Sequence, residues 1–299
     1  MAACINDRTG QCQISNIFPC RSFKFIRPCF SNPVSGNQSC QSKPPCTSDA
    51  DEDDHLWGKI QEEALFDSKQ EPILSHYYCS SILVHNSLET ALANHLALKL
   101  ANSSLSSDSL VTVFSTAFDE DCKIRAAIRE DLEAAKARDP ACISYVQCLL
   151  NFKGFLALQA QRVSHRLWSQ GRAALALVIQ SRVSEVFAVD IHPGARIGQG
   201  VLLDHATGVV VGETTVIGDG VSILHSVTLG GTGKEVGDRH PKVGDGVFIG
   251  AGAKVLGNVV IGEGAKIGAG SVVLRAVPSE GTAVGNPARL VGEKERPRV

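Results

Sequence analysis

The sequence predicts an α+β chain in which an all-helical N-terminal domain precedes a left-handed parallel β-helix of hexapeptide repeats. Two observations lead to this fold class: an aliphatic residue returns every six positions between residues 191 and 273, and apolar residues recur at helical spacing before residue 188. A period of six fits neither an amphipathic helix nor an alternating strand, but it suits a β-helix with triangular coils.

The aliphatic repeat predicts one short strand on each side of a coil, with the aliphatic side chain in the axial stack. It runs through Ile191, Ile197, Leu203, Val211, Ile217, Ile223, Leu229, Val243, Ile249, Val255, Ile261, Ile267 and Val273. Glycine follows at positions 198, 212, 218, 230, 244, 250, 262 and 268, and we expect it at tight corners with positive φ. A low-complexity glycine-rich region would not keep such a period.

Candidate functional residues gather at two breaks in this register. Eight residues instead of six separate Leu203 from Val211, and fourteen separate Leu229 from Val243. Insertions into a solenoid map to one face, where the rigid stack can hold chemical groups against a ligand. Because His, Asp, Arg and Lys cluster at both breaks, the sequence predicts a functional site on that face.

Changes in composition divide the chain into four segments. Residues 1–50 are rich in Ser, Pro, Asn and Cys and poor in acids, which is typical of a disordered or targeting segment. The helical N-terminal domain is predicted for 51–188, the catalytic β-helix for 189–278 and a C-terminal tail for 279–299.

Helices are predicted where apolar residues follow helical spacing. These stretches are 56–65, 88–100, 124–135 and 143–177. Pro72 and Pro140 should separate helices. Asp139, just before Pro140, fits an ordinary cap or turn residue.

Composition excludes several classes of function. The net charge is −2 and there is no long basic run, so neither nucleic acid nor a membrane surface is an expected partner. No apolar run approaches the roughly 18 residues of a spanning helix, so the chain should be soluble. The ten cysteines form no CxxC and follow no secretory signal, which predicts reduced thiols in an intracellular protein and no metal site.

His205, in the eight-residue break, is the strongest candidate for a general base. Acyl transfer to a hydroxyl needs a base near the alcohol, a fixed orientation for that base and a polar site for the oxyanion. Asp190 is a candidate to orient the imidazole and stabilise the imidazolium. The two residues are fifteen apart, whereas a coil has about eighteen, so two ordinary surface residues remain the alternative.

The fourteen-residue break supplies candidates for substrate binding in Arg239 and His240. Arginine clamps a carboxylate with two parallel hydrogen bonds, which suits an amino acid better than a sugar; a solvated loop is the alternative. The GGTGK stretch from Gly230 fails the P-loop pattern and better suits a backbone edge that a pantetheine arm approaches. His192 and His225 are expected to be structural.

These segments together resemble the serine O-acetyltransferase family, in particular its plant members. The resemblance rests on VDIHP, LDHATGVVVGE, SILHSVTLGGTGK, GDRHPK, IGAGAKVLGN and AVGNPARLVG, and on RDPACISY in the helical part. It covers about residues 51 to 293. These motifs are far more specific than the hexapeptide repeat, which many acyltransferases share.

The resemblance implies a role for each matched position. His205 would be the general base and Asp190 its dyad partner. L-serine would be held by Asp139, Asp204, Arg239 and His240, and the acetyl-CoA groove would be lined by Gly231, Thr232, Ala251 and Ala269. The reaction would give O-acetylserine and CoA, the committing step of cysteine biosynthesis, with neither a metal nor an acyl-enzyme.

Assembly and location are also implied by the resemblance. The family forms trimers with active sites between adjacent β-helices, and its helical domains join two trimers. Plant members usually carry a longer tail that enters O-acetylserine sulfhydrylase, whereas this chain ends at Val299, so that partner is doubtful. The start of the chain favours the cytoplasm, with plastid or mitochondrion as alternatives.

Two other functions remain open on sequence grounds. Another hexapeptide transferase, which acetylates a sugar or xenobiotic hydroxyl, would share the coil and the histidine but would not need three residues for a zwitterion, Asp139, Asp204 and Arg239. A catalytically inactive scaffold that regulates a partner enzyme would not need an intact His205 and Asp190.

Overall fold

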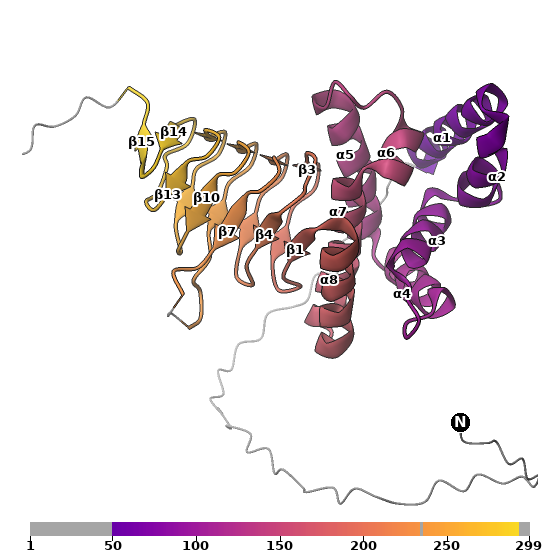
Figure 1. Cartoon of the computed structure of the whole chain (residues 1–299), viewed down its shortest axis with the longest axis horizontal. Coiled ribbons are helices and arrows are strands. Elements are labelled where there is room, and N and C mark those ends of the chain that lie inside the picture. Colours follow the sequence, from indigo (N-terminus) through magenta and orange to yellow (C-terminus); the bar gives the residue numbers. More distant parts are fainter. Residues whose placement is uncertain (1–49, 234–235, 293–299) are drawn as a thin grey trace, which may run out of the picture. The chain divides into compact units, whose positions relative to one another are not determined.

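The computed structural model describes residues 50–233 and 236–292, in which a helical domain is followed by a parallel β-helix (Figure 1). Three of the predictions concern residues that lie outside the described ones. They are the targeting segment with its six cysteines, Lys234 of the GGTGK stretch, and the C-terminal tail that bears on binding to the sulfhydrylase. Cys79, Cys142 and Cys148, inside the described residues, are free.

The helical domain contains eight α-helices within the described residues. They are α1 (Ala50–Gln70), α2 (Ser75–Tyr78), α3 (Leu88–Leu100), α4 (Ser107–Glu120), α5 (Cys122–Arg138), α6 (Tyr145–Asn151), α7 (Lys153–Ser169) and α8 (Ala173–Phe187). A 3-10 turn (Pro72–Leu74) and a π turn (Cys79–Leu83) flank α2. Pro72 thus begins a new element, and Pro140 follows the C-cap of α5, as predicted.

The apolar spacing in the sequence does not predict helix α4. Its serines and threonines obscure the spacing of Leu110, Phe114 and Phe118, which are all fully buried. Burial of each such side chain contributes roughly 1.5–3 kcal/mol. Leu65 was expected to be buried on the apolar face of its helix, but 45% of its surface is exposed.

Three sheets form the sides of the β-helix (Figure 1). The first sheet contains β1 (Val189–Ile191), β4 (Val209–Val211), β7 (Thr228–Gly230), β10 (Lys254–Leu256) and β13 (Val272–Val273). The second contains β2 (Arg196–Ile197), β5 (Val216–Ile217), β8 (Lys242–Val243) and β11 (Val260–Ile261). The third contains β3 (Leu202–Leu203), β6 (Ser222–Ile223), β9 (Phe248–Ile249), β12 (Lys266–Ile267), β14 (Thr282–Gly285) and β15 (Ala288–Leu290).

Strand pairing confirms the aliphatic repeat and its breaks. Val211 pairs in parallel with Leu229, and Leu229 pairs with Val255. All three side chains are buried in the axial stack. Since the coil returns to register after the fourteen-residue break, the described residues between β7 and β8, 231–233 and 236–241, form no strand of the stack.

The β-helix extends beyond the boundary predicted at residue 278. Strand β14 pairs in parallel with β12, and β15 folds back antiparallel on β14. Val277 takes the next stacked position after Val273, four residues later instead of six, and Ala283 follows after six. The prediction ended too early because the short step from Val273 to Val277 breaks the hexapeptide spacing.

The glycines that follow the aliphatic residues allow close approach between coils and do not provide the positive φ that we expected. A Cβ on Gly198 would overlap Asp219 of the next coil. The positive-φ glycines lie two residues further on, at Gly200 and Gly220, where φ is 64° and 67°. The repeat therefore combines one glycine for spacing with another for the turn.

A buried ion pair joins the helical domain to the first coil. Arg162 of α7 donates to Asp131 of α5 at 2.7 Å, and Asp131 accepts from the Val201 amide at 2.8 Å. Burial raises the pKa of Asp131, while Arg162 opposes this shift. A Cβ on Gly154 of α7 would overlap the Leu203 carbonyl oxygen. These contacts hold α7 directly against the strand that leads to the eight-residue break.

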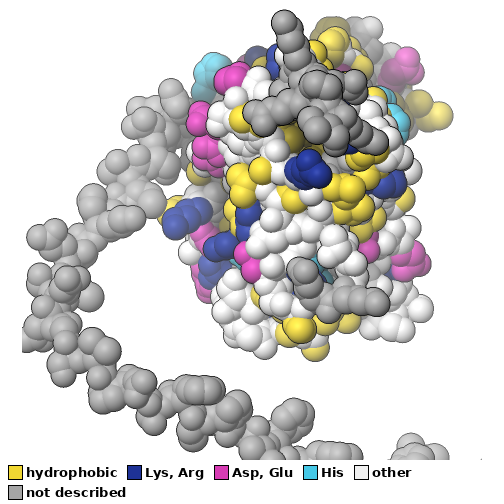
Figure 2. All heavy atoms as spheres, turned by 90° about the vertical axis from the view of Figure 1, so that its left-hand side faces the viewer, with side chains coloured by type: hydrophobic (Ala, Val, Ile, Leu, Met, Phe, Trp, Pro, Cys, Tyr) yellow, Lys and Arg dark blue, Asp and Glu magenta, His cyan; other side chains and the backbone are white. Residues whose placement is uncertain are grey.

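The end of the β-helix that carries β14 and β15 faces the viewer in Figure 2, which shows hydrophobic side chains among Lys, Arg, Asp and Glu side chains and uncharged polar surface. Leu274 and Val284 are among the exposed hydrophobic residues of this end. Across the helices from residue 50 onward that the structure describes, none is long and apolar enough to span a membrane.

Candidate active site

His205 lies at the corner where β3 of the first coil leads into β4. Its backbone is left-handed with φ of 55°, and Ala206 follows with φ of 54°. This conformation costs a non-glycine residue about 1–2 kcal/mol, and such strain is concentrated at functional sites. The two extra residues of the break are thus used to make a strained turn.

The His205 side chain projects into solvent with few neighbours. It is 77% exposed, and its Nε2 atom lies 3.8 Å from Asp204 Oδ1. The ring of His225, which we expected to be structural, lies edge-on at a centroid distance of 6.0 Å. Within the described chain no hydrogen bond or ion pair joins His205 to Asp190, whose carboxylate instead accepts from Gln180 Nε2 at 2.7 Å. The dyad therefore stays a prediction.

The corner of His205 continues along the β-helix as one edge. We call it the His205 edge, and it comprises Asp204, His205, His225, Ala251 and Ala269. Backbone hydrogen bonds link its successive corners: the Gly252 amide donates to the His225 carbonyl at 2.9 Å, and the Gly270 amide donates to the Ala251 carbonyl at 2.8 Å. Beyond His225 the small alanine side chains leave the backbone accessible to a ligand.

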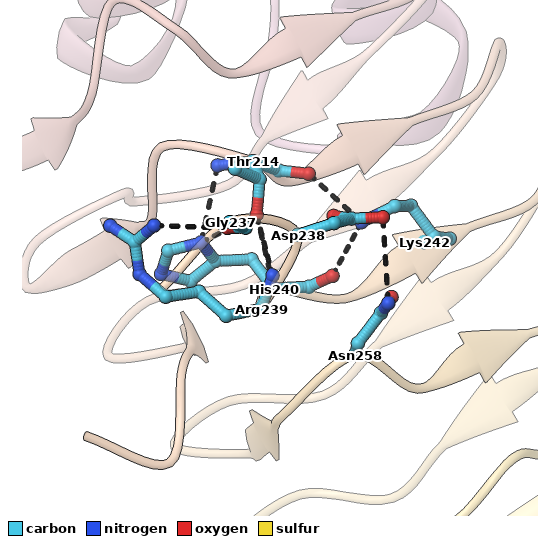
Figure 3. A network of polar contacts seen from close by, with 7 residues as sticks. All are labelled: Thr214, Gly237, Asp238, Arg239, His240, Lys242 and Asn258. Carbon is cyan, nitrogen blue, oxygen red and sulfur yellow. Dashed lines mark hydrogen bonds and ion pairs between the residues drawn. The ribbon is translucent and has the colours of Figure 1, made fainter. Parts of the chain in front are cut away.

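The fourteen-residue break forms a second edge, between the first and second sheets (Figure 3). We call it the loop edge, and it comprises Glu213, Thr214, Gly231, Thr232, Arg239 and His240. Arg239 donates to Glu213 Oε2 at 2.7 Å and to the Gly237 carbonyl at 3.1 Å. The hydrogen bond from Arg239 lowers the pKa of Glu213. Arginine has five N–H donors, so donors remain for a ligand.

His240 is buried at the loop edge, with 7% of its surface exposed. Its Nδ1 atom accepts a hydrogen bond from the Thr214 amide at 3.1 Å. Burial, followed by the charge of Arg239, lowers the pKa of His240, so the ring is neutral near pH 7. A Cβ on Gly212 would overlap the ring, and one on Gly231 would lie 3.5 Å from Nε2.

The expectation that both breaks face one side of the solenoid is wrong. His205 precedes the strands of the first sheet, whereas the Arg239 loop follows them. About five extended residues at ~3.3 Å each separate the two corners, a distance on the order of 15–20 Å. Insertions occupy different corners of the triangle, so a single chain does not bring His205 and Arg239 together.

Asp139 belongs to the helical domain. It is the C-cap residue of α5, and its Oδ1 atom accepts from the Ala141 amide at 2.8 Å. The adjacent Arg138 donates to Ser222 Oγ at 2.8 Å and to the Gly220 carbonyl at 2.6 Å, at the corner between the second and third sheets. Among the described residues no polar contact joins Asp139 to another predicted serine-binding residue.

Three polar residues of the site were not predicted. Glu213 and Thr214 hold the loop, and Gln180 of α8 holds Asp190. Since residues one coil apart stack, the loop residues could have been matched to the corner beneath them, which is Glu213–Thr214. No such signal marks Gln180. Residues 50–233 and 236–292 contain no group of three or more His, Cys, Asp or Glu that could hold a metal ion.

A triangular parallel β-helix with a histidine at a strained corner defines the class of hexapeptide-repeat transferases. The family model described as Bacterial transferase hexapeptide (six repeats) matches residues 240–275. A second model, Serine acetyltransferase, N-terminal, matches residues 56–160 of the helical domain.

Full-length relatives narrow this class. Serine acetyltransferase 1, chloroplastic, of Arabidopsis thaliana is 58% identical over 299 residues, which cover 100% of this chain and 92% of the relative. Serine acetyltransferase 3, mitochondrial, of the same plant is 55% identical over 313 residues, with coverages of 100% and 80%. The chain therefore belongs to the serine acetyltransferase family, a family of acyltransferases.

Solved structures of relatives share the fold. Soybean serine acetyltransferase complexed with serine is 63% identical, with a TM-score of 0.80 over 81% of this chain and 100% of that one. The enzyme from Brucella abortus in complex with coenzyme A is 46% identical, with a TM-score of 0.80 over 83% and 99%. These relatives bind an amino acid and a coenzyme on the same architecture.

Proposed function

We propose that this chain transfers the acetyl group of acetyl-CoA to the hydroxyl of L-serine, giving O-acetyl-L-serine for cysteine biosynthesis and CoA. The observation that carries the proposal is an exposed histidine on one edge and an arginine–histidine pair on the next, in a member of the serine acetyltransferase family. The serine and coenzyme A complexes of the relatives support the same pair of substrates.

His205 acts as the general base in this mechanism. The serine hydroxyl gives its proton to the imidazole as its oxygen attacks the thioester carbonyl, and Asp190 stabilises the imidazolium. The C–S bond then breaks, and the CoA sulfur takes the proton from His205. No acyl-enzyme is required, because the thioester is already activated.

Charged groups on both edges suit a zwitterionic acceptor. The remaining donors of Arg239 and the Nε2–H group of His240 fit the serine carboxylate. Asp204, beside His205, and Asp139 have the charge needed for the ammonium group. A sugar hydroxyl has neither a carboxylate nor an ammonium group for these charges to bind.

Acetyl-CoA is expected to lie along small residues of both edges. Ala251 and Ala269 belong to the His205 edge, and Gly231 and Thr232 begin the loop edge. At these positions a pantetheine arm can reach backbone N–H and C=O groups, and its thioester then points toward His205. The absence of bulky side chains fits an extended ligand.

We further propose that a complete site needs two copies of the chain. Serine is too small to touch two corners that are on the order of 15–20 Å apart. In a cyclic trimer of parallel β-helices, the His205 edge of one subunit meets the loop edge of its neighbour. Exposed apolar side chains of the helical domain, such as Phe66 and Ile73, suit contacts that join two trimers.

Steady-state kinetics of the purified chain with acetyl-CoA test the proposed function. L-serine is the expected acceptor, whereas ethanolamine, which lacks the carboxylate, and a galactoside should be poor acceptors. A preference for the sugar would favour a different hexapeptide transferase. A folded trimer that releases no CoA with any acceptor would favour the inactive scaffold.

The compartment is a separate proposal. The relatives that match the whole chain are named chloroplastic and mitochondrial, and residues 1–50 are rich in serine and poor in acids. We therefore favour import into plastid or mitochondrion over the cytoplasm. Residues 1–50 fused to a fluorescent protein should direct it to one of these organelles; a diffuse cytoplasmic signal would restore the original prediction.

A further inference from the structure

Thr214 uses its polar groups to hold the active-site loop (Figure 3). Its hydroxyl oxygen accepts hydrogen bonds from the backbone amides of Arg239 and His240, each at 3.1 Å. Its carbonyl oxygen accepts from Lys242 Nζ at 2.9 Å. Both amides donate to the same oxygen atom, so the Thr214 side chain alone sets the position of the Arg239–His240 backbone.

The backbone amide of Thr214 also determines which nitrogen of His240 carries the hydrogen. A backbone N–H can only donate, so Nδ1 of His240, at 3.1 Å from it, must accept. The neutral ring then carries its hydrogen on Nε2. The Thr214 hydroxyl, 2.9 Å from the same Nδ1, adds a second polar contact there.

The groups around His240 favour this neutral form. Its lowered pKa is caused first by burial and then by Arg239, with a further contribution in the same direction from Lys242. His192 of the first coil acts in the same direction, and Glu213 acts against it. Protonation of Nδ1 would also break the bond from the Thr214 amide.

The other ring nitrogen of His240, Nε2, faces the backbone of two glycines. Nε2 lies beside Gly212 and Gly231, where an added Cβ would contact it. No hydrogen bond to Nε2 occurs within the part of the chain that the structure describes. The Nε2–H group is therefore a donor without an internal acceptor, next to the guanidinium of Arg239.

We propose that Thr214 is a positioning residue that fixes His240 with its hydrogen on Nε2, so that the loop edge presents a preformed donor to the serine carboxylate. Glu213 does the equivalent for Arg239 through the 2.7 Å ion pair. The proposal rests on the proposed function for the identity of the ligand. The tautomer itself is measurable without turnover.

The test compares two adjacent threonines in the full-length protein. Thr214→Val removes the hydroxyl that holds the loop, and Thr214→Ser keeps it. Thr215→Val is the matched control, because Thr215 is fully buried and its hydroxyl has no hydrogen-bond partner among the described residues. Each variant is examined by kinetics, by calorimetric titration with L-serine and by NMR of 15N-labelled histidine, with His240 assigned from a His240→Gln spectrum.

In Thr214→Val we expect the KM and Kd for serine to rise about 10-fold, since two amides lose their acceptor. The kcat and the KM for acetyl-CoA should change less than about 2-fold. Thr214→Val keeps the backbone amide but frees the Arg239–His240 backbone, so the ring should no longer be held against that amide and the Nε2–H signal of His240 should be lost or mixed. Thr214→Ser and Thr215→Val should resemble the unaltered protein.

Two results would overturn the proposal. The first is an intact Nε2–H signal and unchanged serine binding in Thr214→Val. The second is an equal loss in Thr215→Val, which would show that any change at this corner disturbs the loop. If serine neither binds nor reacts in the unaltered protein while the tautomer responds as expected, the proposed function fails and the positioning role of Thr214 stands.

Discussion

The two edges of the β-helix hold their functional side chains in different ways. At the loop edge, His240 is 7% exposed and bonded to Thr214, and Arg239 is paired with Glu213. At the His205 edge, the histidine is 77% exposed and its nearest charged atom is 3.8 Å away. The loop edge is therefore preorganised within one chain, whereas His205 has no comparable support among the described residues.

The difference follows from how each register break is built. The fourteen-residue break supplies enough backbone to fold onto the corner beneath it, and hydrogen bonds to Thr214 fix the result. The eight-residue break adds only two residues, which produce the left-handed turn at His205 and Ala206. A short insertion can aim a side chain outward, but it cannot surround it.

The largest effect is expected at the His205 edge. His205→Ala should lower kcat by at least about 10²-fold while the oligomer persists, because general-base catalysis contributes 10² to 10⁴. His225→Ala, with its ring 6.0 Å from His205, is the control and should lose far less. Steady-state kinetics together with sedimentation check both points. Near-normal turnover in His205→Ala would remove this residue from the mechanism.

Mixing two variants, each defective at one edge, tests whether one site uses both edges. His205→Ala and Arg239→Ala subunits, unfolded and refolded together in equal amounts and assayed at L-serine concentrations well below the KM, should recover about a quarter of the unaltered activity, since that fraction of shared sites pairs two intact edges. The separately refolded variants are the controls. If the mixture is no more active than those controls, both edges of a site come from one chain or from a different arrangement.

A smaller and more selective effect is expected at the loop edge. Arg239→Ala should raise the KM for L-serine about 10-fold or more, because a charged hydrogen bond to the carboxylate is lost, with little change in the KM for acetyl-CoA. Arg196→Ala, an exposed arginine on the second sheet, is the matched control. Equal increases for both substrates would indicate collapse of the loop instead of loss of a clamp.

The smallest effect on activity is expected from His95 in α3, whose titration should change the stability of the helical domain and not the two edges. Its Nε2 atom donates to the Leu150 carbonyl at 2.9 Å. Burial lowers its pKa to about 4. Between pH 6.5 and 4 the unfolded chain thus binds more protons, so the free energy of unfolding should fall with decreasing pH by at most about 3 kcal/mol.

Urea unfolding at several pH values checks this dependence on His95. His95→Gln should flatten it, whereas exposed His76→Gln should not. Comparing the two variants shows how much of the pH dependence of the unfolding free energy comes from His95 in the helical domain. An unchanged slope in His95→Gln would assign the acid sensitivity to other groups.

The sequence was most informative where a pattern repeats. The spacing of Val211, Leu229 and their counterparts predicted the stack, because each aliphatic side chain must reach the same axis. The same regularity failed at the last coil, where the stacked Val277 follows Val273 after only four residues. Helix α4 was not predicted because its serines and threonines interrupt the apolar spacing, and its buried face becomes evident only in the packed structure.

By itself, the sequence determined the β-helix, its two register breaks and the residue types that suit acyl transfer to an amino acid. Only the tertiary structure decided that His205 and Arg239 lie on different edges, because breaks one coil apart in sequence fall at different corners of a triangle. It also brought Thr214 to His240, across twenty-six residues. Hydrogen bonds between stacked coils leave no trace in local sequence, since they depend on the length of every coil between the two partners.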